Sequence, residues 1–281
     1  MAAEELPVEL ACRVLGVSVS GYYAWRGRPP SPRAIRHAWL TDVIAGVHAT
    51  SRKTYGVRRV HAELTMGQGI AVGRCAVELV MRRAGIQGLS GRPKFRRVPH
   101  VATATDLVNR QFARSEPDRL WVTDITEHPT REGKVYCCVV LDVFSRRVVG
   151  WSIDSNQETT LVTNALGMAL SNRQPSDDSV IHSDQGTQFT SWAFTQRVLD
   201  AKLLPSMGSV GDCYDNALME SFWSRVQVEL FDRKRWNTRV ELATALFEYL
   251  EVFHNRQRRH SSLGMMTPVE FELRHGAIAA G

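Results

Sequence analysis

Apolar residues recur at helical spacing through the first third of the chain. The pattern predicts two short helices within residues 5–28 and three more within residues 35–85. Between them, the stretch RPPSPRA at 28–34 carries three prolines, which remove hydrogen-bond donors and favour extended backbone, so we interpret it as a linker. The helix predicted over 35–48 is expected to bury one stripe of side chains, formed by Ile35, Trp39, Val43 and Val47.

From residue 118 the pattern becomes that of β-strands. RLWVTDITEHP, KVYCCVVLDVFS and RRVVGWSIDS are rich in β-branched and aromatic residues, and the turns between them are short enough for hairpins. They predict three antiparallel strands. Helical and extended segments then alternate, ending in a long helix over 217–231. The order β-β-β-α-β-α-β-α indicates a mixed sheet flanked by helices.

Composition narrows the class of protein. The 281 residues suit two domains, or one domain with an extension, and at 43% hydrophobic and 23% charged they are ordinary for a globular protein with a sizeable core. Uncharged apolar runs are too short for a membrane span, and the N-terminus lacks the pattern of a secretory signal, so we expect a cytoplasmic protein. Five cysteines without a CxxC pair predict neither a disulfide framework nor a structural zinc site. At least one of the adjacent Cys137 and Cys138 is expected in the core.

Charge is distributed unevenly along the chain. Residues 1–114 contain 18 Lys and Arg and 7 Asp and Glu, a net charge of +11. Residues 115–281 contain 17 and 22, a net charge of −5, which gives +6 for the whole chain. A basic part joined to an acidic part predicts that the first part binds a polyanion. Its three helices resemble a helix-turn-helix arrangement, and a basic tether follows at 90–100. The candidate contacts to nucleic acid are Arg58, Arg59, Arg82, Arg83, Lys94, Arg96 and Arg97. The alternative is a small helical bundle that binds no DNA.

Three acids stand out in the second part. Asp124 falls inside a predicted strand, where Asp is disfavoured, and Asp184 ends another strand, where ligand sites form in such sheets. Glu220 lies on the polar side of its predicted helix and, taken alone, is typical of a solvated surface residue. Together the three supply hard oxygen ligands that suit two Mg²⁺ (or Mn²⁺) ions, a combination that promotes phosphoryl transfer.

The surroundings of these acids carry a family resemblance. Asp124 and Asp184 have 59 residues between them, and 35 separate Asp184 from Glu220. This spacing, with HSDQGTQF and DNALMESFW around the last two acids, resembles the core of DDE transposases and retroviral integrases. More closely, the chain resembles OrfB of bacterial insertion sequences that encode their transposase in two overlapping frames. That likeness extends over about residues 5–275 and includes YGVRRVHAEL, RLWVTDIT, VVLDVFSRRVVGW and FHNRQRRHSSLGMMTP.

The resemblance implies an α/β fold of the ribonuclease-H-like kind, with a mixed five-stranded sheet flanked by helices and preceded by an all-α region. The implied domains are a short helical segment and linker at 1–34, a helix-turn-helix-like DNA-binding domain at 35–100, and a catalytic core with a basic C-terminal extension at 116–281. Asp124, Asp184 and Glu220 would be catalytic and would hold the two ions. The implied reactions are cleavage at the ends of the element and joining of the freed 3′-hydroxyl to other DNA.

The resemblance also implies partners: element ends and target DNA, further copies of the chain in the DNA complex, and an OrfA product or an OrfA–OrfB fusion. No membrane is involved, and the cytoplasmic protein would be nucleoid-associated when bound to DNA. Two alternatives stay open. One is a catalytically idle OrfB product that binds element ends and modulates transposition. The other is a host nuclease with the same fold, against which the basic N-terminal helices argue.

Several single residues qualify the resemblance. Gln227 stands where the family usually has Lys or Arg, so that DNA contact lacks its charge. Arg258 and His260 match the family in the C-terminal basic stretch and are further candidate DNA contacts, although a solvated helix end is the alternative. Asp142 is expected to shape a turn rather than to bind metal. His182 precedes Asp184 by two residues, on the same side of the strand, where it would either support the site or simply pack.

Overall fold

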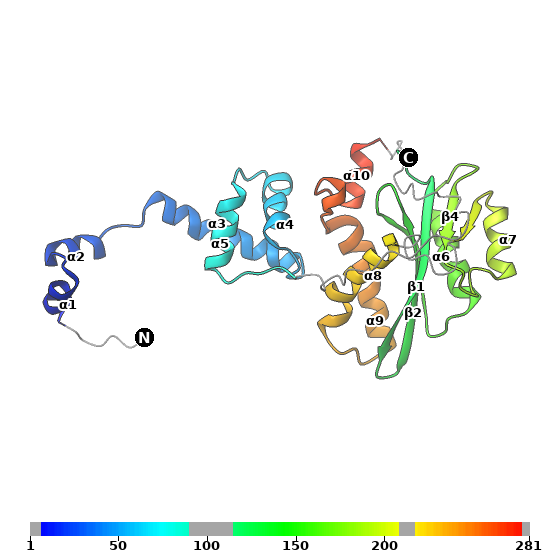
Figure 1. Cartoon of the computed structure of the whole chain (residues 1–281), viewed down its shortest axis with the longest axis horizontal. Helices are drawn as coiled ribbons and strands as arrows, with labels where there is room; N and C mark the ends of the chain where they lie inside the picture. Colours follow the sequence, from blue (N-terminus) through cyan, green and yellow to red (C-terminus); the bar gives the residue numbers. More distant parts are fainter. Residues whose placement is uncertain (1–6, 90–114, 208–216, 277–281) are drawn as a thin grey trace, which may run out of the picture.

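The computed structural model describes residues 7–89, 115–207 and 217–276, which form a helical part and a sheet part (Figure 1). Within these residues no helix is long and apolar enough to cross a membrane. The helical part extends away from the sheet part as an arm that ends in the first two helices (Figure 1). Its elements are α1 (Val8–Leu15), α2 (Val19–Arg26), α3 (Pro32–Thr50), α4 (Val57–Ala62), η1 (Glu63–Gly67) and α5 (Arg74–Arg83).

Local signals in the sequence set the ends of the first helices. Gly16 ends α1 in the left-handed conformation that glycine tolerates best. The Ser18 hydroxyl accepts a hydrogen bond from the backbone N–H of Gly21 and caps α2. The predicted linker over 28–34 is too long, because α3 already begins at Pro32 behind a Ser31 cap. Proline is well suited to the first helical position, where its missing N–H would have no partner in any case.

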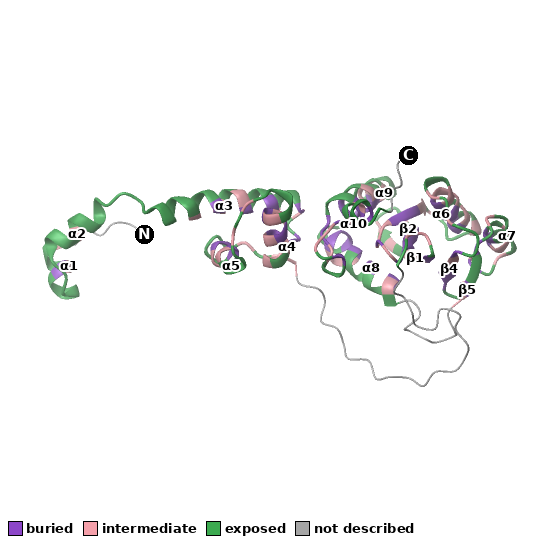
Figure 2. Cartoon of the chain, turned by 90° about the horizontal axis from the view of Figure 1, so that it is seen from above, coloured by how far each residue is buried: buried purple, intermediate pink, exposed green. Residues whose placement is uncertain are grey.

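The predicted buried stripe of α3 is partly wrong. Ile35 and Trp39 are 59% and 47% exposed, and the buried residues are instead Leu40, Ile44 and Val47. Only the second half of α3 packs against α4 and α5, while its first half is solvated (Figure 2). Burial therefore follows the position of the neighbouring helices and not the apolar periodicity alone.

The sheet contains antiparallel and parallel strands, as predicted. β1 pairs with β2 and β2 with β3 in antiparallel register, while β4 and β5 run parallel to β1. The order across the sheet is β3-β2-β1-β4-β5, which confirms the predicted mixed five-stranded sheet. The strands are β1 (Leu120–Thr130), β2 (Gly133–Asp142), β3 (Val148–Asp154), β4 (Val180–Ser183) and β5 (Leu204–Met207).

Helices cover both faces of the sheet. One apolar cluster lies between the sheet and α6 and α7, and a second lies between the sheet and α8, α9 and η3. Cys137 and Cys138 are both buried, one in each cluster, because successive strand residues point to opposite faces. The helical elements of this part are α6 (Thr159–Asn172), α7 (Trp192–Asp200), α8 (Ala217–Glu229), η2 (Phe231–Arg233), α9 (Arg239–Phe247), η3 (Glu248–Gln257), η4 (Ser261–Leu263) and α10 (Pro268–Arg274).

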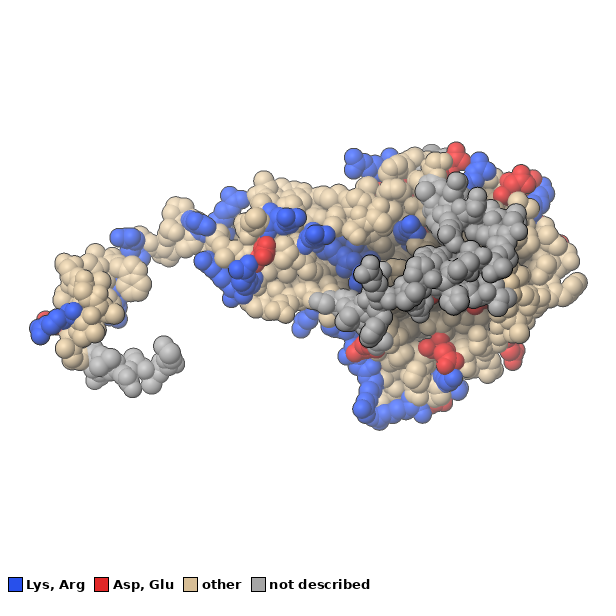
Figure 3. Space-filling model, viewed as in Figure 1, with Lys and Arg blue, Asp and Glu red and all other residues tan. Residues whose placement is uncertain are grey.

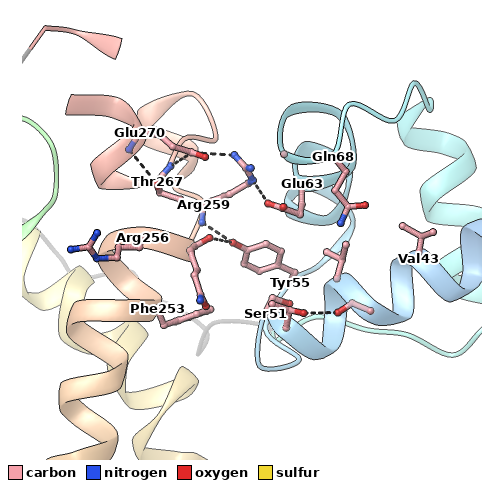
Figure 4. A pocket seen from close by; sticks show the side chains of 15 residues that line it. Val43, Ser51, Tyr55, Glu63, Gln68, Phe253, Arg256, Arg259, Thr267 and Glu270 are labelled. Atoms are coloured by element: carbon pink, nitrogen blue, oxygen red, sulfur yellow. Dashed lines mark hydrogen bonds and ion pairs between the residues drawn. The ribbon is translucent and has the colours of Figure 1, made fainter. Parts of the chain in front are cut away.

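The helical part joins the sheet part through a specific junction. Tyr55 donates its hydroxyl proton to the carbonyl of Gln257 and accepts from the backbone N–H of Arg259, both at 2.8 Å. The Arg259 guanidinium pairs with Glu63 at 2.6 Å and with Glu270 at 3.3 Å (Figure 4). The segment that follows η3 therefore connects the two parts, because Arg259 in it forms hydrogen bonds and ion pairs with residues of both.

Candidate active site and its basic surroundings

The parallel pairing of β1 with β4 brings two of the three acids to matching positions. Val122 stands opposite His182 in this register, and Asp124 and Asp184 each lie two residues farther along. Asp124 lies inside β1, and Asp184 directly follows Ser183, the last residue of β4, so both acids lie just beyond the paired segment, at the carboxyl end of β4. Burial raises the pKa of the Cys138 thiol to about 12, and the charges of Asp124 and Asp184 both add to this rise.

Backbone hydrogen bonds orient both carboxylates. An oxygen of Asp124 accepts from the N–H of Ile125 at 2.8 Å, and an oxygen of Asp184 accepts from the N–H of Gly186 at 2.9 Å. A Cβ at position 186 would come within 2.9 Å of the same Asp184 oxygen. Glycine therefore lets the turn close over the acid. Asp124 is half-buried and Asp184 is exposed.

The third acid comes from α8. Met219, Phe222 and Val226 bury one side of this helix against the sheet, on the face to which Val122 and hence Asp124 belong. Glu220 lies in the first turn of α8 and is exposed, a position where the helix dipole favours a negative charge. Within the described residues, no group of three or more Asp, Glu, His or Cys side chains is arranged to hold a metal ion. The fold brings together the elements that carry the acids, but the described side chains are not arranged as one set of metal ligands.

Two neighbouring residues have structural partners. Asp142 accepts hydrogen bonds from the N–H and hydroxyl of Ser145, at 2.8 and 2.7 Å, and from the N–H of Asp118. Burial raises the pKa of the Asp142 carboxyl to about 6. This confirms its predicted turn role. His182 is buried, and its Nδ1 lies 2.9 Å from the Ser206 hydroxyl, which links β4 to β5.

The predicted DNA contacts differ in exposure. Arg58, Arg82 and Arg83 are exposed on the helical part, and Arg82 pairs with Glu78 on the same helix. Gln227 is half-buried and donates a hydrogen bond to Asp232 at 2.6 Å. The candidates Lys94, Arg96 and Arg97 lie outside the described residues.

Arg258 requires a correction. Only 4% of its side chain is exposed, and its guanidinium donates two hydrogen bonds to Glu229, at 2.7 and 2.8 Å. Its Nε and Nη2 donors are taken up by Glu229, so Arg258 is a buried ion-pair partner and not the exposed DNA contact that was predicted. Arg59 is partly buried beside the same carboxylate at 3.6 Å, and His260 is half-buried against the Arg258 guanidinium.

Sequence reasoning did not identify Glu229, Arg146 or Arg225. The signal for Glu229 was present, because it lies nine residues after Glu220 and so falls on the opposite, apolar side of α8. Its carboxylate also accepts from the Tyr249 hydroxyl at 2.9 Å. Burial alone would raise the pKa of Glu229, but the hydrogen bonds and charge of Arg258, with the charge of Arg59, lower it overall. Arg146 and Arg225 carry no comparable sequence signal.

Comparisons with known proteins agree with this architecture. Models of the integrase core domain match residues 114–213 and 201–268, and a model of an HTH-like domain matches residues 36–94. The transposase for insertion sequence element IS629 of Shigella sonnei is 39% identical over 276 residues, covering 96% of this chain and 92% of the relative. Transposase InsF for insertion sequence IS3A of Escherichia coli (strain K12) is 33% identical over 273 residues, covering 95% and 94%.

Among solved structures, the similarity is distant. The catalytic core domain of HTLV-2 integrase in complex with magnesium, in its trimeric form, gives a TM-score of 0.42 at 17% identity, covering 56% of this chain and 97% of that one. An intasome of simian T-cell lymphotropic virus in complex with the PP2A regulatory subunit B56 gamma gives 0.47 at 15% identity, covering 85% and 76%.

Proposed function

Because the chain belongs to the insertion-sequence transposases, with an HTH-like domain ahead of an integrase core domain, we propose that it moves its own element by DNA cleavage and strand transfer. It cuts a phosphodiester at each element end and then joins the freed 3′-hydroxyl to target DNA. The observation that carries this proposal is the parallel pairing of β1, which contains Asp124, with β4, which Asp184 directly follows, in a sheet that α8 packs against.

Asp124, Asp184 and Glu220 are the proposed catalytic residues. Their carboxylates are hard oxygen donors on three adjacent elements, which fits two Mg²⁺ or Mn²⁺ ions better than zinc. Such ions, when bound, activate the attacking oxygen and neutralise the leaving 3′-oxygen. The chain itself orients the donors, since the N–H groups of Ile125 and Gly186 hold Asp124 and Asp184 in fixed directions.

The helical part is proposed to hold the DNA. The exposed Arg58, Arg82 and Arg83 supply charge for phosphates, which fixes position on a duplex without reading its sequence. Assembly of several copies on the element ends, and cooperation with an OrfA product, belong to the same proposal. The basic tether at 90–100 remains a predicted contact.

A cleavage and joining assay tests the triad. Purified full-length protein is incubated with Mg²⁺ or Mn²⁺ and labelled oligonucleotides that carry the element ends. Asp124→Asn, Asp184→Asn and Glu220→Gln should each abolish cleavage and joining while leaving end binding in place. Asp200→Asn, an exposed acid at the end of α7 on the other face of the sheet, is the matched control and should stay active. Activity of all three triad variants at the wild-type level would overturn the assignment.

One observation favours a second candidate, an idle OrfB product that only binds element ends. Gln227 brings no charge, and its amide is engaged by Asp232 at 2.6 Å. Specific end binding by the wild type without metal-dependent joining, even after OrfA is added, would favour this candidate. Turnover on DNA that lacks element ends would instead indicate a general nuclease.

A further inference from the structure

A cavity of about 300 Å³ opens where α4, the turn between β2 and β3, and α8 meet. Its volume lies at the lower end of ligand-binding pockets. Four arginines line this basic pocket: Arg59 from α4, Arg146 from the turn, Arg225 from α8 and Arg258 from the segment after η3. None of its lining residues is Asp or Glu. Lys and Arg side chains also gather on the surface where the helical part meets the sheet part (Figure 3).

The basic pocket keeps an excess of positive charge. Behind it, Glu229 is the carboxylate that pairs with Arg258, and it lies 3.6 Å from Arg59. The single negative charge of Glu229 therefore lies beside two positive guanidinium groups. Burial lowers the pKa of Arg59, and repulsion from Arg258 and Arg225 lowers it further. Arg225 forms no ion pair with a described acid, and the carboxylate whose charge acts on Arg146, that of Asp142, lies outside the pocket lining.

Arg146 shows the strongest sign of a missing ligand. Its Nη1 atom is buried and has no hydrogen-bond partner among the described residues. Its backbone has φ of 61°, a conformation that favours glycine and costs a residue with a side chain. An unsatisfied charged donor in a sheltered site is also costly. An anion in the pocket would supply the partner that Arg146 Nη1 lacks.

The neighbouring cavity at the domain junction is different. It is larger, about 640 Å³, but Glu63 and Glu270 line it together with Arg259. Arg259 is already paired with both acids (Figure 4). Its charges are therefore balanced within the protein, and the case for an anion applies to the basic pocket alone.

We propose that the basic pocket binds a backbone phosphate of DNA other than the one that is cut. The planar guanidinium groups match the geometry of phosphate oxygens, and the exposed hydroxyls of Ser221 and Ser261 add donors at the rim. The residues of α8 that line the pocket, Leu218, Ser221, Phe222 and Arg225, lie about 100–200° round the helix from Glu220. The pocket therefore opens on the side of α8 away from the catalytic carboxylate, so a phosphate bound there is not the one that is cut.

The pocket also connects recognition with catalysis. Arg59 belongs to the HTH-like domain, whereas Arg146 and Arg225 belong to the integrase core. A phosphate bound among them is held by both parts at once, which fixes the DNA relative to the three acids. This inference rests on the proposed function for its choice of DNA as the source of the phosphate.

Salt-dependent DNA binding tests the pocket without requiring catalysis. The full-length protein is titrated onto a fluorescent duplex in a metal chelator, between about 50 and 200 mM salt. Arg146→Gly and Arg225→Gln should each lower the slope of log affinity against log salt by about one, the value for one lost phosphate contact. Arg197→Gln, an exposed arginine of α7 on the far face of the sheet, is the control and should keep the wild-type slope.

Folding and ligand identity are checked in parallel. Arg146→Gly should melt no lower than wild type, because glycine suits φ of 61°, so a lower slope in this variant reports lost binding and not unfolding. Unchanged slopes in both variants overturn the proposal, whatever the cleavage assay shows. If inorganic phosphate alone raises the melting temperature of the wild type but not of Arg146→Gly, while the DNA slopes stay unchanged, the pocket is a site for free phosphate and the DNA assignment is wrong. Loss of cleavage in the triad assay would leave this binding result standing.

Discussion

Removing Glu229 should destabilise the protein more than any surface change, because it leaves a charge buried without its partner. The carboxylate is 4% exposed and accepts two hydrogen bonds from Arg258, itself 4% exposed. Breaking a buried pair by removing one partner costs about 3–5 kcal/mol, against a total stability of roughly 5–15 kcal/mol for a folded protein. Glu229→Ala should therefore lose a large fraction of the free energy of unfolding.

Urea unfolding at neutral pH, followed by tryptophan fluorescence, measures this loss. The matched control is Glu248→Ala, since Glu248 also bridges the two parts by pairing with Arg52 at 3.6 Å, but is 58% exposed. An exposed pair contributes about 0–1 kcal/mol. Replacing both Glu229 and Arg258 by methionine should recover much of the loss, because an apolar pair carries no unpaired charge. Equal destabilisation by the two alanine substitutions would refute the reasoning.

The pH dependence gives a second check on Glu229. Burial by itself would raise the pKa of this carboxyl, but Arg258 and Arg59 lower it below its ordinary value. A depressed carboxyl pKa contributes stability above the unfolded value of about 4.3, and that stability is lost as the pH falls through the folded value. The difference between wild type and Glu229→Gln should therefore shrink below about pH 4.

Three further predictions concern stability. Gly150→Ala should lower the free energy of unfolding, measured with urea, by about 1–3 kcal/mol, because a Cβ there would come within 2.6 Å of the Ala169 backbone nitrogen. A variant as stable as the wild type would show instead that α6 can shift to make room for the methyl group. Glu272→Ala should lower the free energy of unfolding by about 3–5 kcal/mol, because this fully buried acid pairs with Arg147 at 2.6 Å and with Arg173. A midpoint of urea unfolding equal to that of the wild type would contradict this prediction. Burial, with the charge of Arg258, lowers the pKa of His254 to about 4, below its unfolded value of about 6.5, so its contribution is present above pH 6.5 and is lost as the pH falls toward 4. His254→Phe should remove that part of the pH dependence of unfolding, and an identical pH profile would count against it.

Local patterns in the sequence were enough for most of the sheet part. Strand periodicity and short turns located β1, β2 and β3, because these signals depend on neighbouring residues alone. The spacing of Asp124, Asp184 and Glu220 identified the candidate site, and β1, which contains Asp124, pairs in parallel with β4, which Asp184 follows. Family membership follows from relatives that cover nearly the whole chain.

The partners of charged side chains were decided only by the tertiary structure. In the sequence, Arg258 is one of several basic residues near the C-terminus, but the fold buries it against Glu229, which lies 29 residues away. Arg146 falls in the family-like stretch VVLDVFSRRVVGW, but only the convergence of α4, α8 and the β2–β3 turn brings it together with Arg225 and Arg59. The sequence by itself determined the local elements, because these depend on neighbouring residues, and it fixed the order and spacing of the acids along the chain. Which charges are neutralised, and which are left to bind a ligand, depends on distances across the fold that no single segment contains.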